Sequence, residues 1–153
     1  LRDGRDVARS LAEVSIFDRV GVEMDVRTGA QLWKSVVLSV RAAAPTLDRF
    51  RELRYETLVA DPLAQAVELL KWVGLSCDHS VRAEIASRAT REVSAHGSSG
   101  AAGPGKWHSL PAADLAAIYD EAGDLLVAEG YWTLTEIGPA RGLLRRLLDR
   151  VIR

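Results

Sequence analysis

Arg2 and Ser10 carry side chains that could bind an anion together. Arg2 precedes the turn sequence Asp3-Gly4, and the helix predicted after this turn carries Ser10 on its second turn. The first amides of a helix have no partner within it and therefore favour an anion. The planar fork of an arginine can hold two phosphate oxygens while a serine hydroxyl binds a third. A solvated surface turn is the alternative, because Arg-Asp-Gly is common turn material.

A second cation, Lys106, follows a stretch of small residues. Residues 94–105, which begin at Ser94, consist largely of glycine and serine with one proline. Such a composition buries little apolar surface, so we expect a mobile loop that folds over a site. Ser94 and Lys106 would then flank this loop.

Helices are predicted to position these residues. The sequence predicts them over residues 6–11, 30–44, 62–73, 78–90 and 111–130, where apolar side chains recur at helical spacing. Within 30–44 this spacing places Leu32, Val36 and Val40 along one face. Residues 53–58 instead alternate, with Leu53 and Tyr55 on the same side, and this pattern predicts the one strand.

A single parallel strand needs neighbours, which we expect upstream of this sequence. The chain starts at Leu1 without an initiator methionine, so we interpret it as a fragment. Residues 1–135 would form the C-terminal part of a domain. Residues 136–153 carry an apolar stripe flanked by five arginines and one aspartate, and they predict a basic amphipathic helix that docks on its domain, a partner or an anionic surface.

The composition excludes several classes of function. The 153-residue chain is 48% apolar and 27% charged with a net charge of -1, so it lacks the basic field that non-specific nucleic-acid binding requires. Its one cysteine, Cys77, cannot form an intrachain disulfide, and no cluster has zinc-ligand spacing. No apolar run is long enough to span a membrane. We therefore expect a cytoplasmic protein without a metal, nucleic-acid or membrane partner.

Three segments, in order and at suitable spacing, resemble the sulfotransferases that use 3'-phosphoadenylyl sulfate (PAPS). They are Arg-Asp-Gly-Arg with Ser10, then Arg-Tyr-Glu with the Asp61-Pro62 pair, and then Lys106-Trp107 with a following Leu-Pro. The sequence is most similar to the protein-tyrosine sulfotransferase branch and its bacterial relatives. Each segment alone is a weak motif, but three in register over more than a hundred residues are fairly specific.

The resemblance implies a role for five residues. Arg2 and Ser10 match the pair that holds the 3'-phosphate of PAPS, and Tyr55 matches a strand tyrosine beside the adenine. Ser94 matches the start of a loop over the nucleotide, and Lys106 matches a lysine that reaches a phosphate, whereas Trp107 is assigned to packing. The glycine-rich stretch is unlike the corresponding insert of the family, so the register at Ser94 is open by several residues. None of the three histidines has a neighbouring carboxylate or nucleophile at a suggestive spacing, so none is assigned a role.

The resemblance also implies a fold and a reaction. The fold would be an α/β, P-loop-type sulfotransferase fold, truncated to helices and a remnant of the parallel sheet. The reaction would move a sulfuryl group from PAPS to a hydroxyl or amine of a carbohydrate, lipid, phenol or protein tyrosine. In the family the phosphate loop and the catalytic base lie upstream of the Arg2 segment. We therefore assign no catalytic residue and expect the fragment alone to be inactive.

Two other classes of function remain open on the sequence. A different P-loop-fold transferase or kinase could use Arg2 and Lys106 for an ATP-like nucleotide. A non-catalytic interaction module could use the helices and the basic C-terminal segment to bind a partner. Arg2 and Lys106 would then have no shared ligand.

Overall fold

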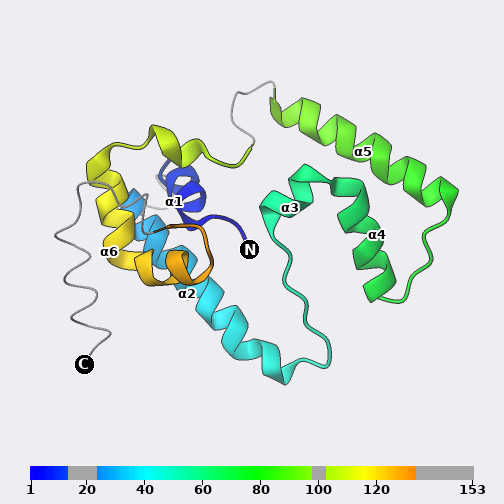
Figure 1. Ribbon diagram of the computed structural model, residues 1–153, viewed down its shortest axis with the longest axis horizontal. Coiled ribbons are helices and arrows are strands. Elements are labelled where there is room, and N and C mark those ends of the chain that lie inside the picture. The colour runs from blue at the N-terminus through cyan, green and yellow to red at the C-terminus, as the bar shows by residue number, and fades with distance from the viewer. Residues whose placement is uncertain (14–23, 98–102, 134–153) are drawn as a thin grey trace. The chain divides into compact units, whose positions relative to one another are not determined.

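The computed structural model describes residues 1–13, 24–97 and 103–133, and this part of the chain is mostly helical, without a β-strand. The elements shown in Figure 1 are α1 (Gly4–Glu13), α2 (Val26–Ala43), η2 (Ala44–Thr46), α3 (Tyr55–Ala60), α4 (Pro62–Trp72), α5 (His79–Gly97), η3 (Lys106–Ser109) and α6 (Ala112–Ala128), where η marks a 3₁₀ helix. Two compact units result. One contains Leu1–Arg2 and Pro45–Lys106, and the other contains Asp3–Ala44 and the described residues from Trp107 onward.

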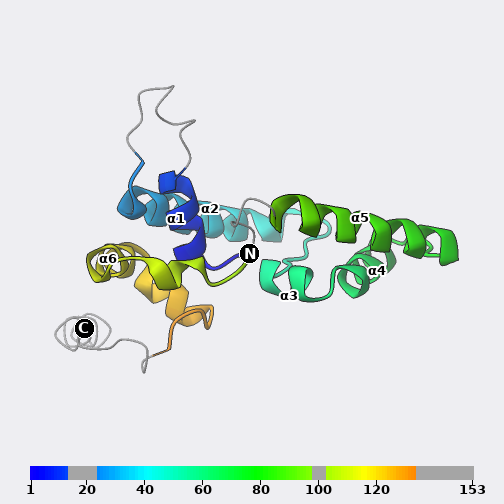
Figure 2. The same cartoon turned by 90° about the horizontal axis from the view of Figure 1, so that it is seen from above.

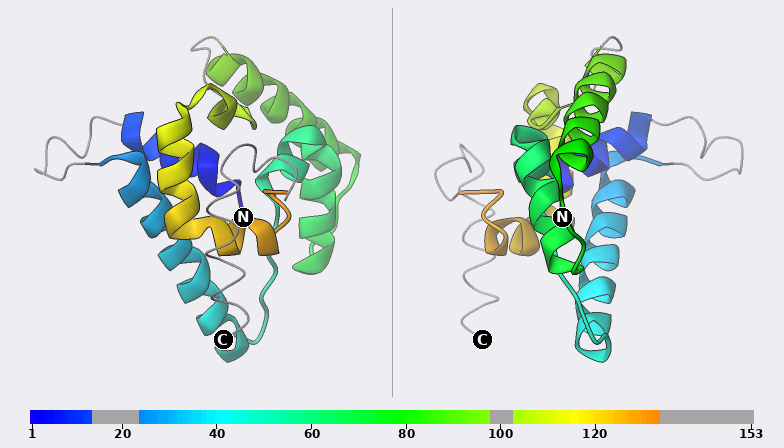
Figure 3. Two further views of the ribbon diagram at one scale, coloured as in Figure 1. Left: turned by 60° about the vertical axis from the view of Figure 1, so that its left-hand side comes forward. Right: turned by 90° about the vertical axis from the view of Figure 1, so that its right-hand side faces the viewer.

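In the second unit α1, α2 and α6 pack around a small core. Figure 2 shows α1 crossing α2, and Figure 3 shows α6 beside them. Small residues allow the α1–α2 contact, because Ala8 and Ala30 are fully buried where the two helices meet. The indole of Trp33 lies directly against Gly4. From α6, Ile118 and Leu126 are fully buried. This packing fixes the beginning of α1, which lies two residues after Arg2.

The face of α2 that the apolar spacing selects is exposed rather than buried. Leu32, Val36 and Val40 are 41%, 52% and 45% exposed. The buried face contains Gly29, Ala30, Trp33 and Val37 instead. The spacing alone does not distinguish the two faces, because both repeat at helical intervals. Close approach to α1 decides between them, since it requires small residues on the buried side.

Ion pairs connect α2 to α6 at the edge of this core. Lys34 Nζ lies 2.7 Å from Asp124 Oδ1, and Arg41 Nη1 lies 2.5 Å from Glu129 Oε1. The guanidinium of Arg27 pairs with Glu121. These bridges cross between helices that are far apart in the sequence. They make the stability of the unit sensitive to the charge on its carboxylates.

We expect this unit to lose stability in acid. Hydrogen bonds from Gln31 and Arg27 lower the pKa of Glu121 below its usual 4.5. Burial raises the pKa of Asp124, but the hydrogen bond from Lys34 and further interactions outweigh it and bring the pKa below 3.8. A lowered folded-state pKa stabilises the fold above the unfolded pKa, and this contribution disappears as the pH falls through the folded pKa.

Urea denaturation followed by tryptophan fluorescence at a series of values from about pH 7 to about pH 2 would test this expectation. The unfolding free energy should fall below about pH 4. The double variant Glu121→Gln/Asp124→Asn should lose less stability over the same range, because two of the titrating groups are gone. A decline as steep as that of the wild type would contradict the assignment to these two carboxylates.

In the first unit, α3 to α5 follow the predicted helix signals. Asp61 caps α4 by accepting a hydrogen bond from the Ala64 amide at 3.0 Å, and Pro62 occupies the first turn. After α4 the chain turns at Gly74, whose φ of +82° favours glycine. Asp78 accepts a hydrogen bond from the Val81 amide at 2.9 Å at the start of α5. Helices were thus correctly predicted over 62–73 and 78–90, as they were over 6–11, 30–44 and 111–130.

The strand predicted over 53–58 is wrong, because α3 begins at Tyr55. Arg54 before it is extended, and the chain here meets Leu1. The amino terminus of Leu1 donates to the Leu53 carbonyl at 2.5 Å, and the Tyr55 amide donates to the Leu1 carbonyl at 2.7 Å. Beyond this contact a strand would leave its backbone groups without partners, whereas a helix satisfies them internally. The predicted sheet remnant is therefore reduced to two hydrogen bonds among residues 1–13, 24–97 and 103–133.

The predicted loop over 94–105 is also partly wrong. Helix α5 continues to Gly97, so Ser94 is helical. Residues 98–102 and the predicted C-terminal helix of 136–153 lie outside the described residues. The chain is described again from Gly103, and Gly105 adopts a φ of +88° directly before η3. Lys106 is the first residue of that 3₁₀ helix.

Candidate functional site

The segment around the predicted anion site is buried. Asp3, Arg5 and Asp6 are 5%, 3% and 2% exposed, and they are the buried charged residues of the part of the chain that the structure describes. The alternative of a solvated surface turn concerned Arg2, which is half-buried, whereas the three charged residues that follow it in the turn and early helix are enclosed. Burial of charge is costly unless each group is paired or hydrogen-bonded, so this segment must have partners.

Asp3 and Arg5 form the most enclosed ion pair of the described residues. Asp3 Oδ2 accepts from Arg5 Nη2 at 2.7 Å, and Asp3 Oδ1 accepts from Arg5 Nε at 3.0 Å. The same Oδ1 accepts from the Arg5 backbone amide at 2.9 Å. Arg5 Nη2 also donates to the Tyr131 carbonyl, which follows α6. The carboxylate of Asp3 therefore already occupies one of the α1 amides that were expected to attract an external anion.

The guanidinium of Arg5 lies close to two indoles. Its Cζ is 3.5 Å from the centroid of the Trp107 ring and 5.3 Å from that of Trp132. Trp132 packs edge-on against Tyr119 at a centroid separation of 4.8 Å. An arginine in this position gains cation–π attraction on the faces where it has no hydrogen bonds. Trp107, which the sequence assigned to packing, packs on Arg5.

Two further contacts attach η3 to α1. Asp6 Oδ1 accepts a hydrogen bond from the Trp107 backbone amide at 2.9 Å. One turn later, Arg9 Nη1 donates to Ser109 Oγ at 2.7 Å. Residues about a hundred positions apart are thus joined along one side of α1. The segment that contains Lys106 is consequently held in place by its other residues.

Arg2 and Tyr55 are the predicted site residues that the structure brings together. The Arg2 Cζ lies 4.6 Å from the centroid of the Tyr55 ring. The hydrogen bonds between Leu1 and the Leu53 to Tyr55 stretch hold the two backbones side by side. Tyr55 opens a helix rather than lying within a strand, and its ring faces the Arg2 guanidinium.

The other predicted residues lie on separate elements. Ser10 is exposed on α1, and Lys106 opens η3. Ser94 lies in α5, where its side chain is outside the described part. The resemblance placed Ser94 at the start of a loop, and this register is wrong because the helix continues past it.

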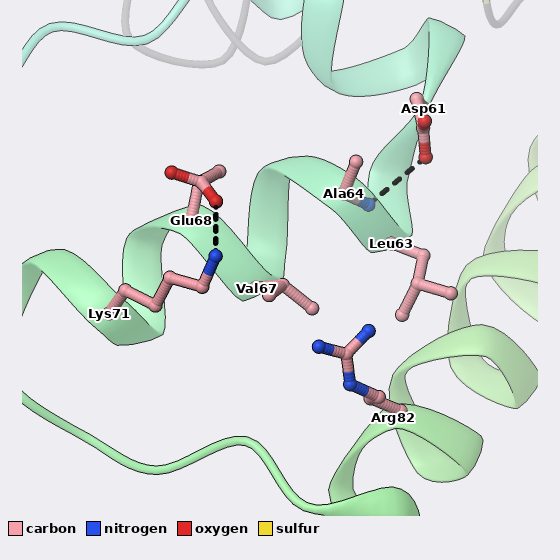
Figure 4. Close-up of a pocket in the computed structure, with 7 residues that line it drawn as sticks. All are labelled: Asp61, Leu63, Ala64, Val67, Glu68, Lys71 and Arg82. Carbon is pink, nitrogen blue, oxygen red and sulfur yellow. Dashed lines mark hydrogen bonds and ion pairs between the residues drawn. The ribbon is translucent and has the colours of Figure 1, made fainter.

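A hollow of about 340 Å³ between α4 and α5 contains none of these residues. Figure 4 shows the Arg82 guanidinium facing the apolar side of α4 near Leu63 and Val67. The Glu68 and Lys71 side chains at its edge pair with each other at 2.8 Å. The hollow is open and lacks a cluster of groups suited to proton transfer. We therefore centre the candidate site on the Arg2 segment.

Arg5 and Asp6 are the site residues that sequence reasoning missed. Their signal was the density of charge in Arg2-Asp3-Gly4-Arg5-Asp6, combined with a glycine at the first helical position. A glycine there permits the close approach of Trp33, whose ring would lie 2.6 Å from an added Cβ. The density of charge marks the segment, but the residues that bury Arg5 and Asp6 lie in η3 and after α6.

Within residues 1–13, 24–97 and 103–133, no group of three or more histidine, cysteine, aspartate and glutamate side chains could hold a metal ion. No helix in the same ranges is long and apolar enough to cross a membrane. Comparison with protein-family models, with curated proteins and with solved structures finds no match for the sequence. The assignment of function therefore depends on the residues themselves.

Proposed function

We propose that this chain is the C-terminal part of a PAPS-dependent sulfotransferase and supplies the 3'-phosphate and adenine side of the nucleotide site. The contact between Arg2 and Tyr55 is the observation that carries the proposal. The resemblance assigns these two residues to adjacent parts of one nucleotide, although they come from different segments. Their stacking at 4.6 Å supports that assignment independently of the sequence motifs.

The α/β, P-loop-type fold is likewise proposed from the resemblance alone, because the described residues form no strand. Leu1 makes two backbone hydrogen bonds, one to the Leu53 carbonyl and one from the Tyr55 amide. These bonds hold the start of the chain, and with it Arg2, beside the beginning of α3.

In the proposed site, Arg2 clamps the 3'-phosphate, Lys106 adds a second positive charge and Tyr55 borders the adenine. PAPS would supply the sulfuryl group to a hydroxyl or amine acceptor, and adenosine 3',5'-bisphosphate would be the leaving group. The residues of this chain contribute by binding and orienting the nucleotide, which is a large part of catalysis in transfers of this kind. No catalytic residue is assigned here, and we propose that the enzyme works in the cytoplasm, where Cys77 would stay reduced.

Calorimetric titration of adenosine 3',5'-bisphosphate into the full-length gene product tests the proposal. We expect binding that exceeds that of 5'-AMP and ATP by about tenfold or more, which corresponds to about 1.4 kcal/mol. Arg2→Ala should abolish this preference for the 3'-phosphate. Arg82→Ala, a matched removal of an arginine from the hollow between α4 and α5, should leave binding unchanged.

The same titration distinguishes the other classes of function. Preferential binding of ATP would favour a P-loop-fold kinase or related transferase. Absence of nucleotide binding would favour an interaction module. Either result would overturn the sulfotransferase assignment.

A further inference from the structure

The ring of Tyr55 supports the guanidinium of Arg2 within one compact unit. The Arg2 Cζ lies 4.6 Å from the centroid of the Tyr55 ring, and both residues belong to the unit that contains Leu1–Arg2 and Pro45–Lys106. A guanidinium over an aromatic ring gains cation–π attraction, which favours this orientation of the side chain over others. The contact therefore restrains the side chain that we propose as the phosphate ligand.

The backbones that carry the two side chains are also held together. The amino terminus of Leu1 donates to the Leu53 carbonyl at 2.5 Å, and the Tyr55 amide donates to the Leu1 carbonyl at 2.7 Å. The Leu1 carbonyl belongs to the planar peptide that also includes the Arg2 Cα. Tyr55 is the first residue of α3, so the helix fixes its Cα as well. Both side chains thus extend from backbone whose relative position is set by these bonds.

A stacked guanidinium can still bind an anion. Its N–H groups lie in the plane of the group and point outward from its edges, whereas an aromatic ring occupies only one face. Arg2 has further contacts, but its Nε atom is buried and has no hydrogen-bond partner within residues 1–13, 24–97 and 103–133. A phosphate oxygen is an acceptor that suits such a donor.

We infer that Tyr55 is a positioning residue that holds the Arg2 guanidinium in the orientation that binds the 3'-phosphate. This inference rests on the proposed function. It gives Tyr55 a task that the resemblance does not assign. The edge of the ring can still border the adenine, but the contribution of Tyr55 to affinity passes mainly through Arg2 and the phosphate.

Titration of the full-length gene product with two nucleotides tests the inference. Adenosine 3',5'-bisphosphate contains the phosphate that Arg2 would bind, and 5'-AMP lacks it. Tyr55→Leu should weaken binding of the bisphosphate by about fivefold, which is the size expected for the loss of one cation–π contact, and should leave binding of 5'-AMP unchanged. Tyr55→Phe keeps the ring and should bind both nucleotides as the wild type does. Equal losses for the two nucleotides in Tyr55→Leu would show that Tyr55 acts on the adenine and would overturn the inference.

A double-mutant cycle between Tyr55 and Arg2 provides a second test. In an Arg2→Ala background, Tyr55→Leu should cause no further loss of affinity for the bisphosphate, because the side chain that it positions is absent. A further loss of about fivefold in that background would contradict positioning through Arg2. If Tyr55→Leu does not fold, Tyr55→Met serves with the same expectations, since it also removes the ring and keeps an apolar side chain.

The wild-type titration separates the two hypotheses. A wild type without a preference for the 3'-phosphate defeats the proposed function. A preferring wild type whose Tyr55→Leu variant loses affinity equally for both nucleotides defeats only the inference. Trp72→Leu is the matched control, because it removes another cation–π contact of the same unit, in which the Arg49 Cζ lies 5.2 Å from the Trp72 ring centroid. Its affinity for both nucleotides should equal that of the wild type.

Discussion

Asp3→Ala is expected to destabilise the chain by about 3–5 kcal/mol, because it leaves the guanidinium of Arg5 buried without its counter-charge. The Arg5 and Asp3 side chains are 4% and 8% exposed, so water cannot replace the lost carboxylate. The variant also removes the acceptor for the Arg5 backbone amide at the start of α1. Urea denaturation followed by tryptophan fluorescence would measure the change in the free energy of unfolding.

The fluorescence can be assigned to the unit that contains the pair. Trp33, Trp107 and Trp132 belong to this unit, whereas Trp72 belongs to the other. A Trp72→Phe background therefore reports on the unit of interest. Glu84→Ala removes one partner of an exposed pair with Arg88 and should leave the transition unchanged.

A second substitution distinguishes loss of charge pairing from loss of packing. Replacing a buried ion pair by apolar side chains of similar volume is often nearly neutral, whereas removing one partner is costly. Asp3→Ala/Arg5→Met should therefore be more stable than Asp3→Ala alone, since a methionine can pack against Trp107 and Trp132. A double variant that is less stable than the single variant would contradict the explanation by uncompensated charge.

The helices could be predicted from the sequence because their signals are local. Asp61 and Pro62 mark the start of α4, and Gly130, with a φ of +71°, follows the end of α6. The prediction of a strand over 53–58 was wrong because the signals for a strand are not local. Whether an alternating segment forms a strand depends on a partner along its length, and among the described residues only Leu1 pairs with this segment.

The proposed site residues were named from motifs, and their role stays a prediction. The contact between Arg2 and Tyr55 is a structural observation that the motifs did not predict. The burial of Arg5 and Asp6 could not be inferred, because it depends on Trp107 and on residues after α6, more than a hundred positions away. Charged residues are mostly exposed unless they are paired, so residue type alone would have placed Arg5 and Asp6 on the surface.

Gly29→Ala should destabilise the unit of α1 and α2 by about 1–3 kcal/mol through overpacking. An added Cβ at this position would lie 2.9 Å from both Ala8 Cα and the Ala8 carbonyl oxygen. Both atoms belong to the backbone of α1, which cannot turn away as a flexible side chain can. The helices would have to separate, and this separation would weaken the burial of Trp33 beside Gly4.

The informative result is whether Gly29→Ala lowers or raises the free energy of unfolding. At an exposed helical position, alanine in place of glycine stabilises by about 1 kcal/mol because of helix propensity. Ser39→Ala, on the exposed side of α2, measures the propensity effect alone and should be neutral or slightly stabilising. A Gly29→Ala variant that is as stable as the wild type, or more stable, would mean that α1 and α2 do not pack at the observed separation. The beginning of α1, where Arg5 and Asp6 are buried, would then lack its packing support.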